Sequence, residues 1–240
     1  MGRRIIILLL TAAVLAAGGC GQRITVSETP EAPPESVQET AEPELPPEPV
    51  SEAAEPLPEP AAADFVRVTD HLPQVRVDLR YAGEDNFTGQ TIYDFTDAYL
   101  RYGTVQKLAE AQAALEDAGY SLLIWDAFRP TAAQFRLWEV CPDPVYVADP
   151  EKGYSSHSRG NTVDVTLTDP DGNAVEMPSG FDDFSSLADR DYSDVSEAAA
   201  ANAQLLEDVM TDCGFRPYSG EWWHFTDTDD YPVEEDFSPG

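Results

Sequence analysis

The sequence predicts an α+β domain that has a small, mostly antiparallel sheet with flanking helices. Short runs of alternating apolar and polar residues are typical of half-buried strands, and longer runs with apolar residues three or four positions apart are typical of helices. The expected strands are 75–79, 122–125, 162–167, 175–177 and 222–226, and the expected helices are 98–118, 131–140 and 196–212. Residues 65–240 are roughly 175 residues, enough for one domain with one core.

The first strand and the first helix have clear limits. Val75, Val77 and Leu79 occupy every second position, which gives the strand one buried face. The helix expected over 98–118 should end at Gly119, because glycine readily takes the left-handed conformation that follows many helices.

The middle of the domain is expected to form a hairpin. Val163, Val165 and Leu167 make one apolar face, so Asp164 leaves its strand on the opposite face. A side chain on that face is free to bind a metal ion. Residues 170–173, Pro-Asp-Gly-Asn, are a turn signal that should return the chain to the strand at 175–177.

The last helix and strand are separated by a turn. The helix over 196–212 should end before Gly214. In a regular strand, Glu221 and His224 would point to opposite faces because their spacing is odd. We therefore expect Glu221 in the turn after Gly220, and His224 in the strand.

Residues 1–19 have the features of a secretory signal peptide. Two arginines precede an apolar run of thirteen residues, Ile5 to Ala17, which is too short to span a bilayer comfortably. Small residues then lead directly to Cys20, which resembles the lipidated cysteine of bacterial lipoproteins, although Ala17 stands where leucine is usual. We expect an extracytoplasmic lipoprotein anchored to the bacterial membrane through Cys20; plain secretion is the alternative.

Residues 20–64 are expected to be a disordered acidic linker. Ten Glu and ten Pro lie between Glu28 and Pro60, with no Lys or Arg. Such a composition cannot bury a core, and proline and like charges extend the chain. The segment would hold the domain at 65–240 away from the membrane.

The net charge restricts the binding partners of the chain, and the cysteine content restricts its possible disulfides. The formal net charge is -31, so the chain would be repelled by nucleic acid, whose binding draws on Lys and Arg. It also has no basic face for anionic lipid. With Cys20 taken as the anchor, Cys141 and Cys213 remain, and the sequence leaves open whether they form a disulfide or stay as free thiols.

Two short motifs supply the residues of a metal site. His157 and Asp164 lie seven residues apart across a glycine turn, and Glu221 and His224 lie three apart. A catalytic zinc ion typically has three protein ligands and one position for water, and His157, Asp164 and His224 make such a set. Glu221 is then left to take a proton from that water.

These motifs resemble a known family. Ser-x-His-x-x-Gly-x-x-x-Asp with a distal Glu-x-x-His resembles the zinc D,D-peptidase superfamily, and Glu-Trp-Trp-His at 221–224 is similar to its D-alanyl-D-alanine dipeptidase branch. The segments 81–89 and 124–130 support this branch, whereas Thr162 departs from the usual Ala or Ser. The resemblance implies the Hedgehog/D,D-peptidase-like fold, one zinc ion, and hydrolysis of D-alanyl-D-alanine or a related small dipeptide.

The resemblance also implies roles for residues outside the metal site. Arg129 would hold the substrate carbonyl oxygen and the oxyanion that replaces it, because fixed guanidinium donors suit developing negative charge. Asp126 would orient Arg129. Ser155 and an aspartate in a Phe-Asp segment would bind the substrate termini; we take Asp182 as the candidate, although the sequence does not separate it from Asp183.

Other functions compete with this interpretation. A D,D- or L,D-carboxypeptidase that trims peptidoglycan stems would have similar motifs. A non-catalytic, zinc-containing lipoprotein that binds cell-wall peptides is a second alternative, but such a protein would be expected to lose Glu221. A Ser155-His157-Asp164 nucleophile site is the third, and it leaves Glu221 and His224 without a role.

Overall fold

The computed structural model describes residues 58–239. The predicted signal peptide at 1–19, Cys20 and most of the predicted linker at 20–64 lie outside these residues. The helices and strands, in chain order, are β1 (Phe65–Arg67), α1 (Val68–His71), β2 (Arg76–Val77), β3 (Tyr99–Arg101), α2 (Tyr102–Asp117), β4 (Ser121–Asp126), α3 (Thr131–Val140), β5 (Thr162–Thr168), α4 (Glu197–Asp212), β6 (Phe215–Tyr218) and β7 (Glu221–Asp227).

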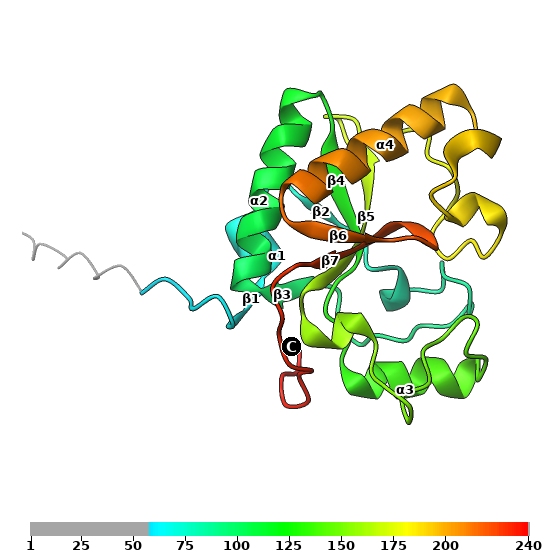
Figure 1. The fold of residues 1–240 in the computed structure, drawn as a ribbon. Helices are drawn as coiled ribbons and strands as arrows, with labels where there is room; N and C mark the ends of the chain where they lie inside the picture. The colour runs from blue at the N-terminus through cyan, green and yellow to red at the C-terminus, as the bar shows by residue number, and fades with distance from the viewer. Residues whose placement is uncertain (1–57, 240) are drawn as a thin grey trace, which may run out of the picture. The chain divides into compact units, whose positions relative to one another are not determined.

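A five-stranded sheet passes through the middle of this part of the chain (Figure 1). Its strand order is β2-β4-β5-β7-β6. The β2 and β4 strands are parallel, and the other three pairings are antiparallel. The β1 and β3 strands form a separate antiparallel pair. The predicted α+β class with a mostly antiparallel sheet is therefore confirmed.

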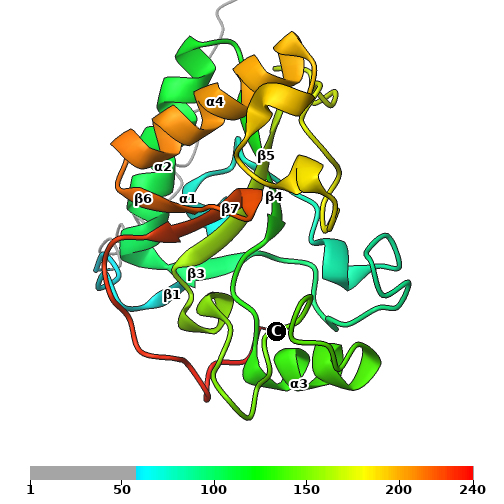
Figure 2. The same ribbon diagram turned by 45° about the vertical axis from the view of Figure 1, so that its right-hand side comes forward.

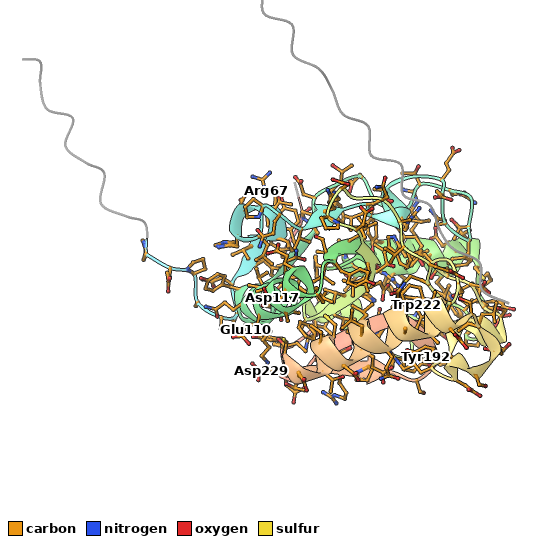
Figure 3. All side chains as sticks on the ribbon, turned by 90° about the horizontal axis from the view of Figure 1, so that it is seen from above. Arg67, Glu110, Asp117, Tyr192, Trp222 and Asp229 are labelled. Atoms are coloured by element: carbon orange, nitrogen blue, oxygen red, sulfur yellow. The ribbon has the colours of Figure 1, made fainter. Side chains whose placement is uncertain are left out.

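Helices α2 and α4 lie side by side over one face of the sheet (Figure 1, Figure 2). Their apolar residues meet those of the central strands in a continuous core, which includes Leu108, Leu115, Leu206, Met210, Val163, Val165 and Phe225. Each such side chain contributes roughly 1.5–3 kcal/mol when it is fully buried. In the view from above, Trp222 and Asp229 lie toward opposite ends of α4 (Figure 3). No helix within residues 58–239 is long and apolar enough to cross a membrane.

The predicted limits of α3 and α4 are confirmed. Ser196 caps α4 by accepting a hydrogen bond from the backbone N–H of Ala199 at 3.1 Å. Gly214 follows the helix with a φ of 87°, which is the left-handed conformation expected of a glycine there.

The helix expected over 98–118 begins later than predicted. Tyr99–Arg101 is the strand β3, because Leu100 pairs with Val66 of β1. The helix α2 starts at Tyr102 and ends at Asp117. A pairing partner more than thirty residues away thus overrides the local helical pattern.

The hairpin expected between 162–167 and 175–177 is mostly absent. A single bridge joins Thr168 to Ala174, and residues 175–177 form no strand. The backbone oxygen of Glu176 accepts a hydrogen bond from the side chain of Asn202 on α4, at 2.9 Å. The chain after the turn is therefore tied to α4 and does not continue along β5. The first predicted strand is also shorter, since β2 contains only Arg76–Val77.

The two cysteines of the domain are free thiols. Cys141 and Cys213 are each half-buried at the end of a helix. Burial raises the pKa of the Cys213 thiol, and the carboxylates of Glu110 and Asp212 raise it further. The structure thus selects the free-thiol alternative.

Candidate metal centre and active site

The sheet register brings three polar side chains together on one face. Asp164 of β5 is paired with Asp126 of β4 on one side and with His224 of β7 on the other. Directly opposed residues of neighbouring strands point to the same face. The neighbouring β5 residues, Val163 and Val165, belong to the hydrophobic core. Asp164 therefore leaves β5 on the face expected from its sequence.

His157 reaches the same point from a short 3-10 helix, Ser156–Arg159. Its Nδ1 lies 2.8 Å from the backbone oxygen of Ala127. A carbonyl oxygen can only accept, so Nδ1 carries the proton and Nε2 keeps its lone pair. That Nε2 lies 3.4 Å from Oδ2 of Asp164. The imidazole is thus held with its free nitrogen directed toward the carboxylate.

The Asp164 carboxylate completes a set of three ligand atoms. Its Oδ1 is buried and lies 3.0 Å from Nδ1 of His224, but it forms no hydrogen bond with any residue that the structure describes. Each of His157, Asp164 and His224 offers one possible ligand atom, and these three atoms lie within 4.8 Å of one another. A buried oxygen without a partner is costly. These donors, two imidazoles and one carboxylate, fit a zinc ion with an open coordination position.

Electrostatics favour an ionised carboxylate at the centre of this set. Burial alone would raise the pKa of Asp164, but the imidazoles of His157 and His224 outweigh it and hold that pKa well below its usual range. Burial likewise opposes the charge of His157, whereas Asp164 and Asp126 raise its pKa overall. A negative, desolvated carboxylate between two imidazoles is a suitable environment for a cation.

Glu221 stands beside this set and not within it. Its Oε2 lies 3.4 Å from Nδ1 of His224. Burial raises the pKa of the Glu221 carboxyl, and the charge of Asp164 raises it further. A carboxylate with a raised pKa next to a metal site is suited to accept and return a proton.

The expectation that Glu221 lies in a turn is wrong. Glu221 is the first residue of β7, but the pairing with β6 shifts register: Pro217 pairs with Phe225, whereas Tyr218 pairs with Glu221. The irregularity breaks the alternation of side chains. Glu221 and His224 can therefore face the same site from one strand.

Arg190 stabilises this irregular strand. Its Nη2 donates to the backbone oxygens of Glu221 at 3.0 Å and His224 at 3.1 Å, and its Nη1 donates to the Glu207 carboxylate of α4 at 3.0 Å. Sequence reasoning missed Arg190, because no motif marks a loop arginine that acts on distant backbone atoms.

Arg129 is held in a buried network at the end of β4. Its guanidinium donates to Asp126 at 2.7 Å, to Tyr93 at 3.2 Å and to Gln134 at 3.0 Å. Asp126 is fully buried and also accepts from the Tyr93 hydroxyl at 2.7 Å. The structure thus pairs Asp126 with Arg129, and the guanidinium, which has five N–H donors, retains two for another partner. The sequence offered no signal for Tyr93.

Asp182 and Asp183 have different surroundings. Asp182 accepts a hydrogen bond from the Tyr81 hydroxyl at 2.8 Å, and burial raises its pKa to about 7 against the lowering effect of that bond. Asp183 accepts from a backbone N–H in an exposed turn. Asp182 has a positive φ of 52°, which is uncommon for a residue other than glycine. Asp182 is thus the aspartate with the more enclosed carboxylate.

Ser155 is placed as a cap and not as a nucleophile. Its Oγ accepts from the backbone N–H of His157 at 3.3 Å, while the His157 ring faces Ala127 and Asp164. No hydrogen bond joins the Ser155 hydroxyl to the imidazole among the described residues. The geometry therefore disfavours the serine nucleophile alternative.

A metal-ligand set with an adjacent carboxylate and a buried guanidinium defines the class of protein as a metallohydrolase. The pattern of the M15 peptidase family, described as D-Ala-D-Ala dipeptidase, matches residues 61–239. A D-alanyl-D-alanine dipeptidase of Escherichia coli K12 is 41% identical over 153 residues, covering 64% of this chain and 79% of the relative. Another from Streptomyces coelicolor is 36% identical over 187 residues, covering 68% and 91%.

A solved structure, VanYB in complex with D-alanine-D-alanine, matches with a TM-score of 0.37 and 14% identity, covering 55% of this chain and 73% of that one. The sequence matches cover most of the domain and most of each relative. The chain belongs to the D-Ala-D-Ala dipeptidase family of metallopeptidases, and the resemblance found from its motifs is confirmed.

Proposed function

We propose that this protein is a zinc-dependent dipeptidase that hydrolyses D-alanyl-D-alanine or a closely related small dipeptide. The observation that carries the proposal is the convergence of His157, Asp164 and His224, where the buried Oδ1 of Asp164 has no hydrogen bond within residues 58–239. The names of the relatives support the choice of substrate.

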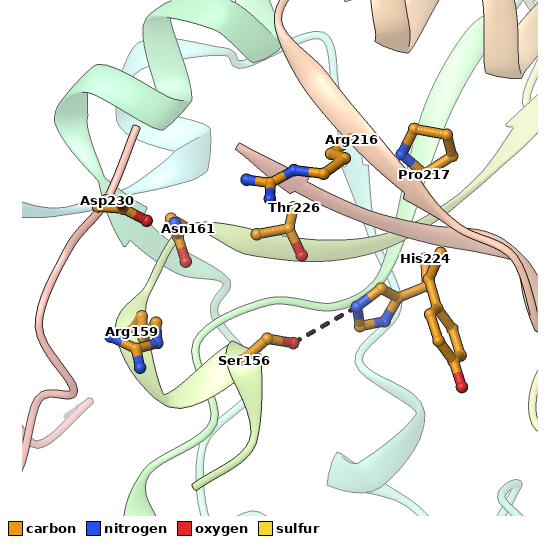
Figure 4. A pocket seen from close by; sticks show the side chains of 9 residues that line it. Ser156, Arg159, Asn161, Arg216, Pro217, His224, Thr226 and Asp230 are labelled. Carbon is orange, nitrogen blue, oxygen red and sulfur yellow. Dashed lines mark hydrogen bonds between the residues drawn. The ribbon is translucent and has the colours of Figure 1, made fainter. Parts of the chain in front are cut away.

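His157, Asp164 and His224 would hold the metal. When bound, a zinc ion supplies a Lewis acid that lowers the pKa of water and polarises a carbonyl group. His157 is oriented through Ala127, and His224 is oriented through Ser156, whose Oγ lies 3.4 Å from Nε2 of the ring (Figure 4). These outer contacts fix which nitrogen of each ring faces the metal site.

Glu221 acts as the general base and then as the general acid. It takes the proton of the attacking water and returns it to the leaving amine, a role that fits its raised pKa and its position beside His224. Arg129 stabilises the oxyanion with its remaining N–H donors, since Asp126 and Tyr93 keep the guanidinium in place.

Asp182 and Ser155 are the candidates for binding the two termini of the substrate. The enclosed Asp182 carboxylate, held by Tyr81, suits the ammonium group of a dipeptide. Ser155 stands next to the ligand His157 and is the candidate for the other terminus. Recognition of both ends would restrict the enzyme to short substrates.

A comparison of two substrates tests this function. The zinc-loaded protein is assayed with free D-alanyl-D-alanine and with a stem pentapeptide at matched concentration. We expect faster hydrolysis of the dipeptide. Preference for the pentapeptide would instead support the carboxypeptidase alternative, and hydrolysis of neither would support a binding protein.

We further propose that the protein is an extracytoplasmic lipoprotein anchored through Cys20. The support is sequence alone: an apolar run of thirteen residues, small residues before Cys20, and an acidic linker rich in proline. Cys20→Ser should release the protein from the membrane fraction. Equal membrane retention of the variant would contradict a lipid anchor.

A further inference from the structure

A pocket opens beside the His224 ring, where Ser156 contacts its Nε2 (Figure 4). It has a volume of about 640 Å³ and is lined by Ser156, Arg159, Asn161, Arg216, Pro217, Tyr218, His224, Thr226 and Asp230. Neither Glu221, Arg129 nor Asp182 contributes to it. His224 forms part of the wall, and Ser156, which holds the outer nitrogen of this ring, lines the pocket too.

Two guanidinium groups face this pocket. Arg159 donates through Nη1 to the backbone oxygen of Tyr231 at 2.7 Å, which fixes its position and leaves other donors available. Arg216 has no hydrogen bond and no ion pair within residues 58–239, whereas the other lysines and arginines of that part each have at least one polar partner. Arg216 is exposed, so all five of its N–H donors are open to a ligand in the pocket. Arginine forks match carboxylate groups well.

The pocket also has a carboxylate for a cation at its rim, next to a buried amide. Asn161 is 2% exposed, and its Nδ2 donates to the backbone oxygen of Asp229 at 2.9 Å, so its orientation is fixed. Its Oδ1 is closed off from solvent and has no hydrogen-bond partner in the described part of the chain, so Asn161 forms a fixed wall of the pocket. Asp230, at the rim, has no ion pair with either arginine of the pocket in the described part of the chain. Figure 4 shows Asn161 and Asp230 together at one side of the pocket.

We propose that this pocket binds a free amino acid as its zwitterion, and that the ligand is the alanine released by the dipeptidase reaction. The carboxylate pairs with the exposed guanidinium groups of Arg216 and Arg159, and the ammonium group meets the exposed carboxylate of Asp230. Pro217 and Tyr218 give the small side chain an apolar wall. The choice of alanine rests on the proposed function. The choice of a zwitterion rests only on the charged groups that line the pocket.

Binding of three small molecules to the zinc-loaded full chain tests the proposal. Titration calorimetry is done with D-alanine, with propionate, which lacks the ammonium group, and with ethylamine, which lacks the carboxylate. We expect saturable binding of D-alanine, weaker binding of propionate and none of ethylamine. Arg216→Gln should weaken D-alanine and propionate at least roughly fivefold, because both lose a charge-assisted hydrogen bond.

Two further variants make the test specific. Asp230→Asn should weaken D-alanine but not propionate, because only D-alanine has an ammonium group. Arg76→Gln removes the same charge from another part of the surface, where the guanidinium contacts the backbone oxygen of Pro170. This variant should bind D-alanine and propionate as tightly as the wild type does. Absence of saturable D-alanine binding, or binding unchanged by Arg216→Gln, would overturn the proposal.

Hydrolysis of D-alanyl-D-alanine, measured on the same preparations, separates the two proposals. If the dipeptide is hydrolysed and alanine does not bind through Arg216, only the pocket assignment fails. If alanine binds through Arg216 and no dipeptide is hydrolysed, the pocket stands and the proposed reaction fails.

Discussion

The positions of the functional side chains in this site are set by buried partners more than by neighbours in sequence. Asp126 is the clearest case: it is fully buried, accepts hydrogen bonds from Tyr93, Arg129 and the backbone of Ala127, and lies 3.7 Å from Nδ1 of His157. We assign it as a positioning residue for Arg129. Its charge also compensates a guanidinium that has little access to water.

Asp126→Asn should therefore destabilise the protein and slow turnover. Loss of one partner of a buried ion pair costs about 3–5 kcal/mol, to be measured as the free energy of unfolding in urea. Zinc content should be unchanged, because Nδ1 of His157 is held by Ala127. The exposed Arg67–Asp70 pair is the control, and Asp70→Asn should leave stability unchanged within error. Equal effects of the two variants would contradict the assignment.

At the scale of elements, short irregular segments place the proposed metal ligands on the sheet. Gly160 ends the 3-10 helix of His157 in a left-handed conformation, with φ of 75°, just before β5. A Cβ at this position would lie 2.4 Å from a ring atom of Phe65 on β1. Glycine is needed here for two reasons, the backbone conformation and the close approach of another strand.

Gly160→Ala should lower both stability and zinc affinity. Gly119 is the matched control, because its φ is 85° but no atom lies within 4 Å of an added Cβ. Gly119→Ala should cost roughly 1–2 kcal/mol from backbone strain alone, with zinc binding unchanged. We expect a larger loss at Gly160, measured by denaturant unfolding and zinc titration. The same loss at both positions would show that the contact with Phe65 is unimportant.

The elements also show what a sequence can predict. The set of His157, Asp164 and His224 could be proposed from spacing, because strand alternation and a glycine turn are local features. The position of Glu221 could not, since it depends on a register shift between β6 and β7. The contacts of Arg190 and Tyr93 join segments far apart in the chain, and local patterns carry no information on such pairings.

At the scale of the whole domain, one face of the sheet is packed by α2 and α4, and the other presents Asp126, Asp164 and His224. The hydrophobic core therefore supports the strands that carry the ligands. The metal would join β5, β7 and the 3-10 helix at one point. Metal binding and folding of the domain should consequently be coupled.

Removal of the metal should lower the melting temperature of the protein. A ligand that binds only the folded state adds about 2.7 kcal/mol at one hundred times its dissociation constant. Thermal unfolding is measured with a chelator, and again after zinc is restored. His157→Ala should melt at the same temperature with and without chelator. If the wild-type protein is equally insensitive, no metal contributes to its stability.

The central claim is that Glu221 moves a proton while His157, Asp164 and His224 hold zinc. Glu221→Gln retains the size of the side chain but cannot accept a proton. The direct measurement is the turnover number for D-alanyl-D-alanine together with the zinc content of the same sample. We predict that turnover falls by roughly 10²- to 10⁴-fold while one zinc ion per chain stays bound. Loss of zinc from the variant, or unchanged turnover, would contradict this division of roles.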